Sequence, residues 1–146
     1  MYETLVIPVF MYGSECWTLT KEDEHRIEVA EMNWLRKILR ITRLHRMRNE
    51  DIPNRLQQEV TLNDRIQKKR LRWFGHVTRM IERRLARRVM HCYVTGRRTR
   101  GRQRKRWRDN IMENLETRNI SLRQAVDLAG DRVKWRHFVT SSLATS

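Results

Sequence analysis

Hydrophobic residues recur every three or four positions along much of this chain, which is the spacing of amphipathic helices. The clearest example follows Thr20, whose hydroxyl can cap a helix that carries acids in its first turn. The pattern predicts a helix over Lys21–Thr42 with basic residues on its other faces. Its apolar positions are Ile27, Ala30, Trp34, Leu35, Ile38, Leu39 and Ile41.

A second amphipathic helix is predicted to begin after Thr61 or Asn63, either of which can cap it. Its apolar stripe comprises Leu62, Ile66, Trp73, Phe74, Val77 and Met80. Basic residues occupy the other side and are left for solvent or phosphate: Arg65, Lys68, Lys69, Arg72 and Arg79. This helix therefore combines a buried side with a cationic side.

Two shorter segments precede this helix. The apolar run Leu5–Tyr12 fits a buried strand or a buried helix, and Pro8 is awkward in the middle of either. We favour the helix. Asn49 can cap a short helix over Glu50–Gln57, after a basic connection over Arg43–Arg48.

Three further helices are predicted after a segment without hydrophobic periodicity, Val94–Arg104, which we expect to be an extended loop. A helix resumes near Gln103 and runs to about Arg118, with Trp107, Ile111 and Leu115 on its apolar stripe. Ser121 and Gly130 bound the next helix, Leu122–Ala129. Asp131 starts the last helix, whose apolar residues are Val133, Trp135, Phe138 and Val139.

The expected fold is all-α, a small irregular bundle of five to seven helices with a basic loop. The 146 residues suit a single compact domain. Within it we distinguish a helical segment over residues 1–60 and a basic helical segment over residues 61–146.

The charge of the chain indicates a polyanionic partner, because 32 Lys and Arg residues against 17 acids give a net charge of +15. Twelve of these cations lie between Arg83 and Arg108, where there is no acid. A solvated charge run or a nuclear-import patch is one interpretation. The other is contact with nucleic-acid phosphates, which guanidinium groups bind with paired hydrogen bonds. The candidate contact residues in this tract are Arg97, Arg98, Arg100, Arg102, Arg104, Lys105, Arg106, Trp107 and Arg108.

Aromatic residues stand beside arginines at Trp73, Phe74 and Trp107, an arrangement that can stack unpaired bases. Each also falls on a helical apolar stripe. We expect Trp73 and Phe74 to be core residues, and both interpretations stay open for Trp107.

Other chemistry finds little support in the sequence. Cys16 and Cys92 form no disulfide framework, and with His45, His76 and His91 they match no zinc pattern. No cofactor motif, nucleophile with a base partner or membrane-length apolar run occurs. We expect a nuclear or cytoplasmic protein, neither secreted nor membrane-bound, without cofactor or metal.

Four blocks stand out, in this order and at this spacing: LVIPVFMYGSECWTLTKEDEHRIEVAEMNWLRKIL, RNEDI, RLRWFGHVTRM and GRQRKRWRDNI. They closely resemble the C-terminal end of the reverse transcriptase reading frame of non-LTR (LINE-type) retrotransposons. The similarity extends over nearly the whole chain, from Leu5 to about Val139. The resemblance implies a helical thumb and post-thumb region that grips template and primer. It also implies an upstream polymerase palm as a partner in a full-length relative, and an upstream endonuclease.

The two-aspartate motif of that polymerase has no counterpart in this sequence, so ligands for two-metal nucleotidyl transfer are missing. Two positions depart from the family pattern. His45 stands where an acid is common, and Gln103 stands where a proline is common, which allows the following helix to extend back toward Arg102.

Two interpretations follow. The chain is either a nucleic-acid-binding fragment of a reverse transcriptase without enzymatic activity, or a host-retained helical module that binds a protein. An enzyme in its own right is a third, less favoured class.

Overall fold

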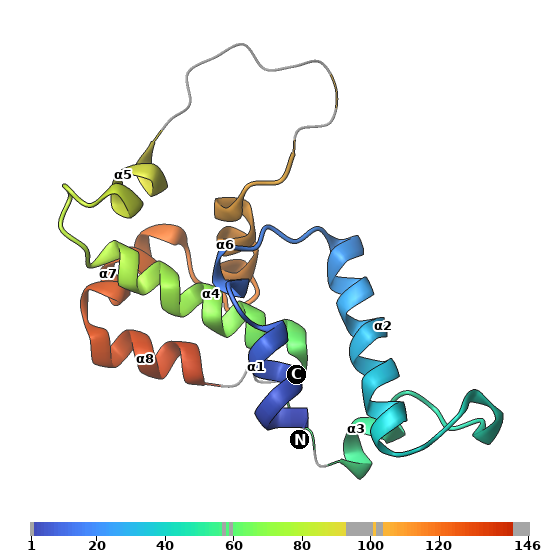
Figure 1. The fold of residues 1–146 in the computed structure, drawn as a ribbon. Coiled ribbons are helices and arrows are strands. Elements are labelled where there is room, and N and C mark those ends of the chain that lie inside the picture. The colour runs from blue at the N-terminus through green and yellow to red at the C-terminus, as the bar shows by residue number, and fades with distance from the viewer. Residues whose placement is uncertain (1, 57, 59, 93–100, 102–103, 142–146) are drawn as a thin grey trace. The chain divides into compact units, whose positions relative to one another are not determined.

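The computed structural model describes residues 2–56, 58, 60–92, 101 and 104–141. These residues form eight α-helices and no strand, which confirms the all-α class with one helix more than expected (Figure 1). A short π-helix, Tyr2–Val6, leads into the first of them, so the apolar N-terminal run is helical. The helices are α1 (Ile7–Phe10), α2 (Lys21–Ile38), α3 (Asp51–Arg55), α4 (Leu62–Thr78), α5 (Leu85–His91), α6 (Trp107–Glu116), α7 (Leu122–Gly130) and α8 (Arg132–Thr140).

The chain divides into two compact units. Unit 1 joins Met1–Thr18 to Gln67–Ser146, and unit 2 is the intervening Leu19–Ile66. The start of α4 belongs to unit 2 and the rest of that helix to unit 1.

In unit 2, α2 begins as the sequence predicts. The backbone N–H of Asp23 donates to the Thr20 hydroxyl (3.2 Å), and the N–H of Thr20 donates to the Asp23 carboxylate (3.0 Å). This reciprocal capping box satisfies two backbone donors that the helix itself leaves unpaired. The hydrogen bonds from Thr20 also lower the pKa of Asp23.

The predicted end of α2 at Thr42 is wrong, because the helix stops at Ile38. Arg40 adopts a left-handed conformation (φ 54°). The N–H of Arg40 donates to the carbonyl of Lys37, and the N–H of Ile41 donates to the carbonyl of Arg36. These bonds form a Schellman motif, which usually carries glycine at the left-handed position, so the sequence gives no stop signal here. In keeping with this end, Ile38 is 47% exposed and not a core residue.

The predicted cap at Asn49 is also wrong. Its side chain accepts a hydrogen bond from Arg36 (2.7 Å), and α3 starts at Asp51 without a side-chain cap. Of the two predicted caps of α4, Thr61 is the one observed, because its hydroxyl accepts a hydrogen bond from the N–H of Asp64. Asn63 instead donates to the carbonyl of Glu24.

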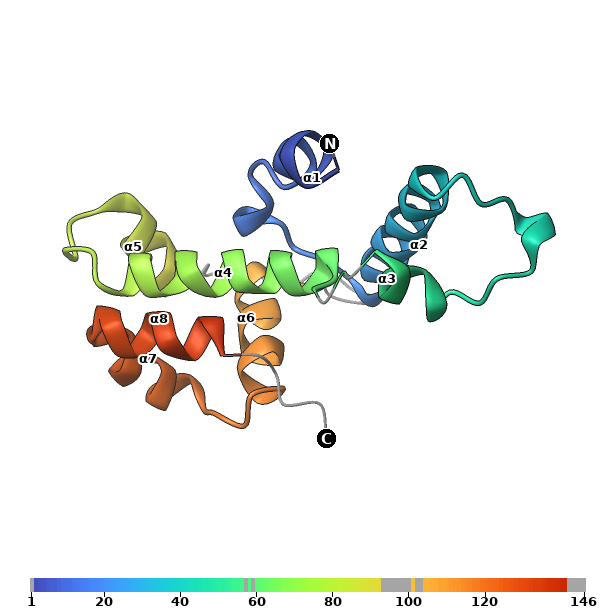
Figure 2. The same ribbon diagram turned by 90° about the horizontal axis from the view of Figure 1, so that it is seen from below.

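Unit 1 is built around a core to which α4, α6, α7 and α8 contribute (Figures 1 and 2). The indole of Trp135 in α8 donates to the carbonyl of Leu71 in α4 (3.0 Å) and its ring lies against Phe74. The buried residues of this cluster are Leu71, Phe74, Ile111, Leu115, Ala125, Ala129, Trp135 and Val139.

Three details of unit 1 differ from the sequence prediction. The buried stripe of α4 includes Leu71, whereas Trp73 is only half-buried. Met80, which lies beyond the end of α4 at Thr78, is also half-buried. In α8, Val133 is 75% exposed. The helix α5 was not predicted, because its short span leaves Leu85 and Val89 exposed.

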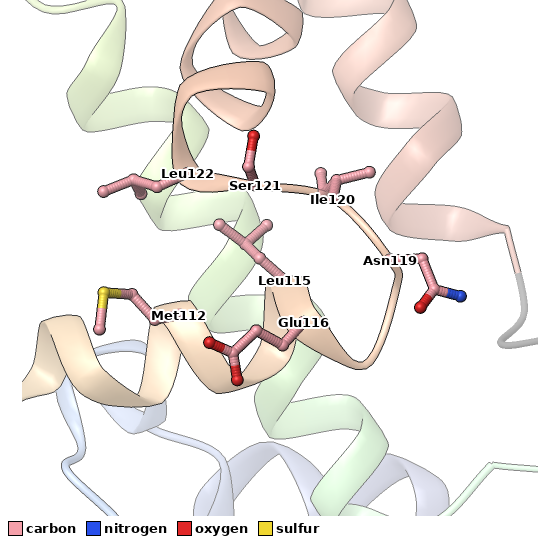
Figure 3. A pocket seen from close by; sticks show the side chains of 7 residues that line it. All are labelled: Met112, Leu115, Glu116, Asn119, Ile120, Ser121 and Leu122. Atoms are coloured by element: carbon pink, nitrogen blue, oxygen red, sulfur yellow. The ribbon is translucent and has the colours of Figure 1, made fainter.

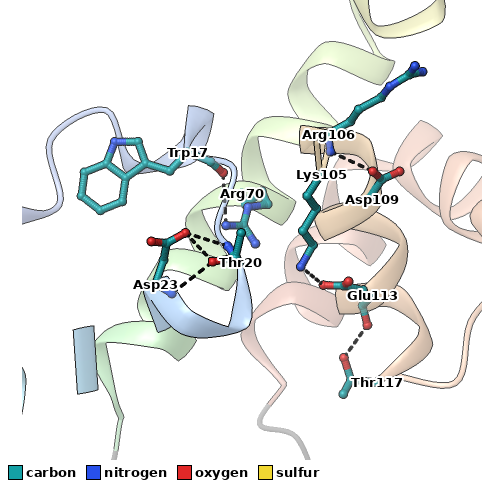
Figure 4. Close-up of polar contacts among 9 residues, drawn as sticks. All are labelled: Trp17, Thr20, Asp23, Arg70, Lys105, Arg106, Asp109, Glu113 and Thr117. Atoms are coloured by element: carbon teal, nitrogen blue, oxygen red, sulfur yellow. Dashed lines mark hydrogen bonds and ion pairs between the residues drawn. The ribbon is translucent and has the colours of Figure 1, made fainter. Parts of the chain in front are cut away.

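The helix expected to resume near Gln103 begins only at Trp107. The carboxylate of Asp109 accepts the N–H of Arg106 (2.8 Å) and fixes the start there (Figure 4). The two following helix starts are confirmed: Ser121 caps α7 and Asp131 caps α8 through their side chains.

Candidate nucleic-acid interface

The predicted cationic residues of α4 differ in how much of their bonding capacity the protein already uses. Lys69 donates to the carbonyl of Met11 (2.8 Å) and lies 3.8 Å from the Glu15 carboxylate. Arg79 donates to the carbonyl of Ala129 in α7 (2.7 Å). Each of these two residues therefore ties α4 to another part of unit 1.

The other basic residues of α4 divide between the two units. Lys68 and Arg72 lie in unit 1, where Arg72 is exposed and Lys68 half-buried. Arg65 lies in unit 2, half-buried and near enough to the Glu31 carboxylate to favour its charged form. Arg70, between them, is fully buried and donates to the carbonyl of Trp17 (3.2 Å; Figure 4). Of these residues, Arg72 is the most accessible to a phosphate.

The arginine tract lies partly outside the described residues, namely at Arg97, Arg98, Arg100 and Arg102. Of its described members, Arg104, Arg106 and Arg108 are exposed. Lys105 differs, because its ammonium group is 2.6 Å from the Glu113 carboxylate and its side chain is only 18% exposed (Figure 4). The role of the tract as a contact surface stays a prediction.

Two of the aromatic residues beside these arginines belong to the core of unit 1. Trp107 packs against the core cluster, and its indole donates to the carbonyl of Glu15 (2.7 Å). Phe74 is buried, as expected, beside Trp135. Trp73 remains half-buried, with its ring 5.4 Å from that of His76. These contacts favour the core interpretation for Trp107.

A pocket of about 570 Å³ lies between α4 and α8 and is lined mainly by cationic side chains. None of the residues that line it is acidic. They are Arg72, His76 and Arg79 from α4 and the turn that follows it, and Arg132, Trp135 and Arg136 from α8. Spacings of four and seven residues place the α4 members on one helix face, and a spacing of four does the same for Arg132 and Arg136.

Arg72 and Arg79 are predicted contact residues from the sequence, whereas Arg132 and Arg136 are not. Their spacing of four residues is the signal that could have identified them. This spacing alone does not show that α8 packs beside α4. That juxtaposition depends on a contact between Trp135 and Leu71, which are 64 residues apart.

The pocket arginines keep most of their donors available. No hydrogen bond or ion pair joins the guanidinium of Arg72, Arg132 or Arg136 to any residue that the structure describes. The nearest acid in sequence, Asp131, accepts the backbone N–H groups of Val133 and Lys134 (2.8 and 3.2 Å). These bonds lower the pKa of Asp131, so it stays ionised as the cap of α8. An anion is therefore the expected occupant of the pocket.

A second pocket, of about 490 Å³, lies where α6 turns into α7 (Figure 3). Apolar side chains dominate its lining, among them Met112, Leu115 and Ile120, and Glu116 supplies its only charge. A carboxylate repels phosphate, so this pocket is not part of the candidate interface.

The described part of the chain offers neither a metal site nor a membrane span. No three His, Cys, Asp or Glu side chains there are grouped to hold a metal ion. None of the helices found there is long and apolar enough to cross a membrane.

The chain is similar to a Caenorhabditis elegans protein that is provisionally named an uncharacterized transposon-derived protein. The two are 28% identical over 143 residues, an alignment that covers 92% of this chain and 51% of the relative. The chain thus spans about half the length of the curated relative it matches. No protein-family model matches the chain. No solved structure matches it significantly.

Proposed function

We propose that this chain is a nucleic-acid-binding segment of a retrotransposon reverse transcriptase that contacts the phosphates of template or primer. The similarity to a transposon-derived protein supports a transposon-related origin. The four sequence blocks between Leu5 and Ile111 support the narrower origin, the region beyond the polymerase palm of a LINE-type element.

The observation that carries the proposal is the α4–α8 pocket. Four arginines, from α8, α4 and the turn that follows α4, converge there without an acid among the lining residues. Charges of one sign gathered in this way are costly unless an anion neutralises them. With a net charge of +15 over the whole chain, a polyanion is the partner that this surface fits best.

The segment contributes no polymerase chemistry of its own in this proposal. Two-metal nucleotidyl transfer needs carboxylates that hold both ions, and the two-aspartate motif has no counterpart in the sequence. The segment would instead hold nucleic acid for a catalytic palm supplied by another part of a longer protein.

Binding measured against salt concentration tests the proposal. Labelled RNA, DNA and RNA–DNA duplexes of equal length are titrated with the protein, and log affinity is plotted against log salt. If the arginines contact phosphates, the plot is linear with a slope of roughly −0.7 to −0.9 per contact. A flat plot, or no binding at low salt, would refute the proposal.

One observation favours a protein-binding module instead. Leu85 and Val89, one turn apart on α5, are 71% and 63% exposed. Such an apolar pair on one helix face can form part of a contact with another protein. The salt series separates the two functions, because an apolar contact depends little on ionic strength.

A further inference from the structure

The α4–α8 pocket brings together more positive charge than an internal phosphate of a nucleic-acid strand can neutralise. An internal phosphodiester carries one negative charge and offers two oxygens that are not bonded to sugar. Three guanidinium groups in the pocket, those of Arg72, Arg132 and Arg136, have no partner among the described residues. Arg79 adds further N–H donors, since its guanidinium uses only one of them for the hydrogen bond to the Ala129 carbonyl.

We propose that this pocket binds the terminal phosphate of a nucleic-acid strand. This inference rests on the proposed function and specifies its ligand. A terminal phosphomonoester carries a charge of about −1.5 to −2 at pH 7 and presents three strong acceptor oxygens. It therefore matches several converging guanidinium groups better than an internal phosphate does.

The geometry of the two helices holds the arginines in place before a ligand arrives. Trp135 lies between Arg132 and Arg136 in sequence, and its indole is bonded to the Leu71 carbonyl within the core. Gly75, one turn after Leu71, lets the Trp135 ring approach the α4 backbone closely. The backbone that carries the pocket arginines is therefore fixed by core packing, which reduces the entropy lost on binding.

The proposal also explains why the pocket is a recess and not a flat basic stripe. At about 570 Å³ it is larger than a phosphate group alone, so a strand end can enter it. A continuous strand has to pass over the opening, because sugars flank each internal phosphate on both sides. A strand end has no such constraint.

Competition binding tests the proposal. Unlabelled single strands of one sequence, with a 5′-phosphate, a 3′-phosphate or no terminal phosphate, displace a labelled strand at moderate salt. We expect at least one phosphorylated strand to bind about tenfold more tightly than the unphosphorylated strand, since a single charged hydrogen bond supplies a factor of this size. Inorganic phosphate serves as a further competitor and should be far weaker than the phosphorylated strand.

The variant R132Q/R136Q should abolish the preference for phosphorylated ends while retaining salt-dependent binding. The matched control R83Q/R123Q also removes two charges, from exposed residues outside the pocket, and should keep the preference. Circular dichroism and a thermal melt confirm that both variants fold. If R132Q/R136Q unfolds, R136Q alone replaces it and should weaken the preference.

Four results would overturn the inference. Equal affinity for phosphorylated and unphosphorylated strands, with salt-dependent binding intact, would reject the end site and leave the proposed function standing. A preference that survives in folded R132Q/R136Q would place the site elsewhere. Inorganic phosphate that competes as well as the strand would show that the pocket recognises the free anion. Absence of any salt-dependent binding would reject the proposed function as well.

Discussion

The indole ring of Trp135 lies against the backbone of α4 at Gly75, so close that no β-carbon fits between them. A β-carbon at Gly75 would lie 2.8 Å from Cε2 of Trp135 and closer still to its Nε1 and Cδ1. Contacts this short do not occur between carbon atoms in folded proteins. Because Trp135 is buried and bonded to Leu71, its ring has little freedom to move away.

Gly75→Ala should therefore destabilise the protein. Alanine favours a helix by about 1 kcal/mol over glycine, but overpacking in a core costs about 1–3 kcal/mol, and here the overlap is severe. We expect a net loss of about 1–2 kcal/mol in urea unfolding. Gly130→Ala is the matched control, since nothing lies within 4 Å of a β-carbon there. Equal stability of the two variants would show that the helices do not approach at Gly75.

The pH dependence of stability should report on Glu31. Its side chain is 5% exposed and accepts the N–H of Leu62 (3.0 and 3.2 Å) and a hydrogen bond from Gln58 (2.6 Å). Burial raises the pKa of Glu31 above its ordinary value of 4.5, although these hydrogen bonds partly oppose the rise. The folded state therefore binds the proton of the Glu31 carboxyl more tightly than the unfolded state does. As a result, the contribution of Glu31 to the free energy of unfolding falls as pH rises from 4.5 through the pKa of the folded state.

Glu31→Gln cannot ionise and should not show this loss. The free energy of unfolding of the variant, minus that of the parent, should rise with pH in the window just above 4.5. Urea unfolding of both proteins at intervals between about pH 4 and pH 7 measures the difference. A difference that stays constant across the window would mean that Glu31 ionises as easily in the folded protein as in the unfolded chain.

Trp107 should behave as a core residue and not as a base-stacking residue. Trp107→Ala should lower stability by somewhat less than the 3–5 kcal/mol typical of a fully buried tryptophan, because Trp107 is half-buried. Trp107→Phe keeps an aromatic ring but loses the bond to Glu15, at a cost of about 1 kcal/mol. Thermal melts and single-strand binding of both variants are compared with those of the parent protein. Loss of single-strand affinity by Trp107→Ala without loss of stability would support stacking instead.

The purified chain should incorporate no nucleotides on primed templates with Mg²⁺ or Mn²⁺. The physical reason is the lack of the two-aspartate motif that would hold the metal ions. Incorporation that persists through purification and scales with the amount of the chain would contradict the proposed role.

Sequence patterns predicted the helix starts better than the helix ends. Thr20, Thr61, Ser121 and Asp131 cap helices as their side-chain chemistry requires. The end of α2 escaped prediction because arginine, not glycine, occupies the left-handed position at residue 40. A local pattern cannot show when hydrogen bonds make an unusual residue adopt that conformation.

The candidate interface was predictable only where it lies on one helix. Arg72 and Arg79 follow from the polar face of α4, whereas Arg132 and Arg136 join them through tertiary packing of Trp135. Other tertiary contacts explain why predicted contact residues differ in accessibility. Lys69 in α4 donates to the carbonyl of Met11, and Lys105, which precedes α6, pairs with Glu113.

The central claim, that arginines bind nucleic acid through its phosphates, is tested most directly by the salt dependence of a tract variant. Replacing Arg97, Arg98, Arg100 and Arg102 by glutamine removes four charges. If all four contact phosphates, the slope of log affinity against log salt flattens by about three or four units, whatever sequence is bound. Helicity should stay unchanged, since the four arginines fall in the segment Val94–Arg104, which the sequence predicts to be an extended loop. A slope that is the same in the variant and in the parent would contradict the claim that these arginines are the contact surface.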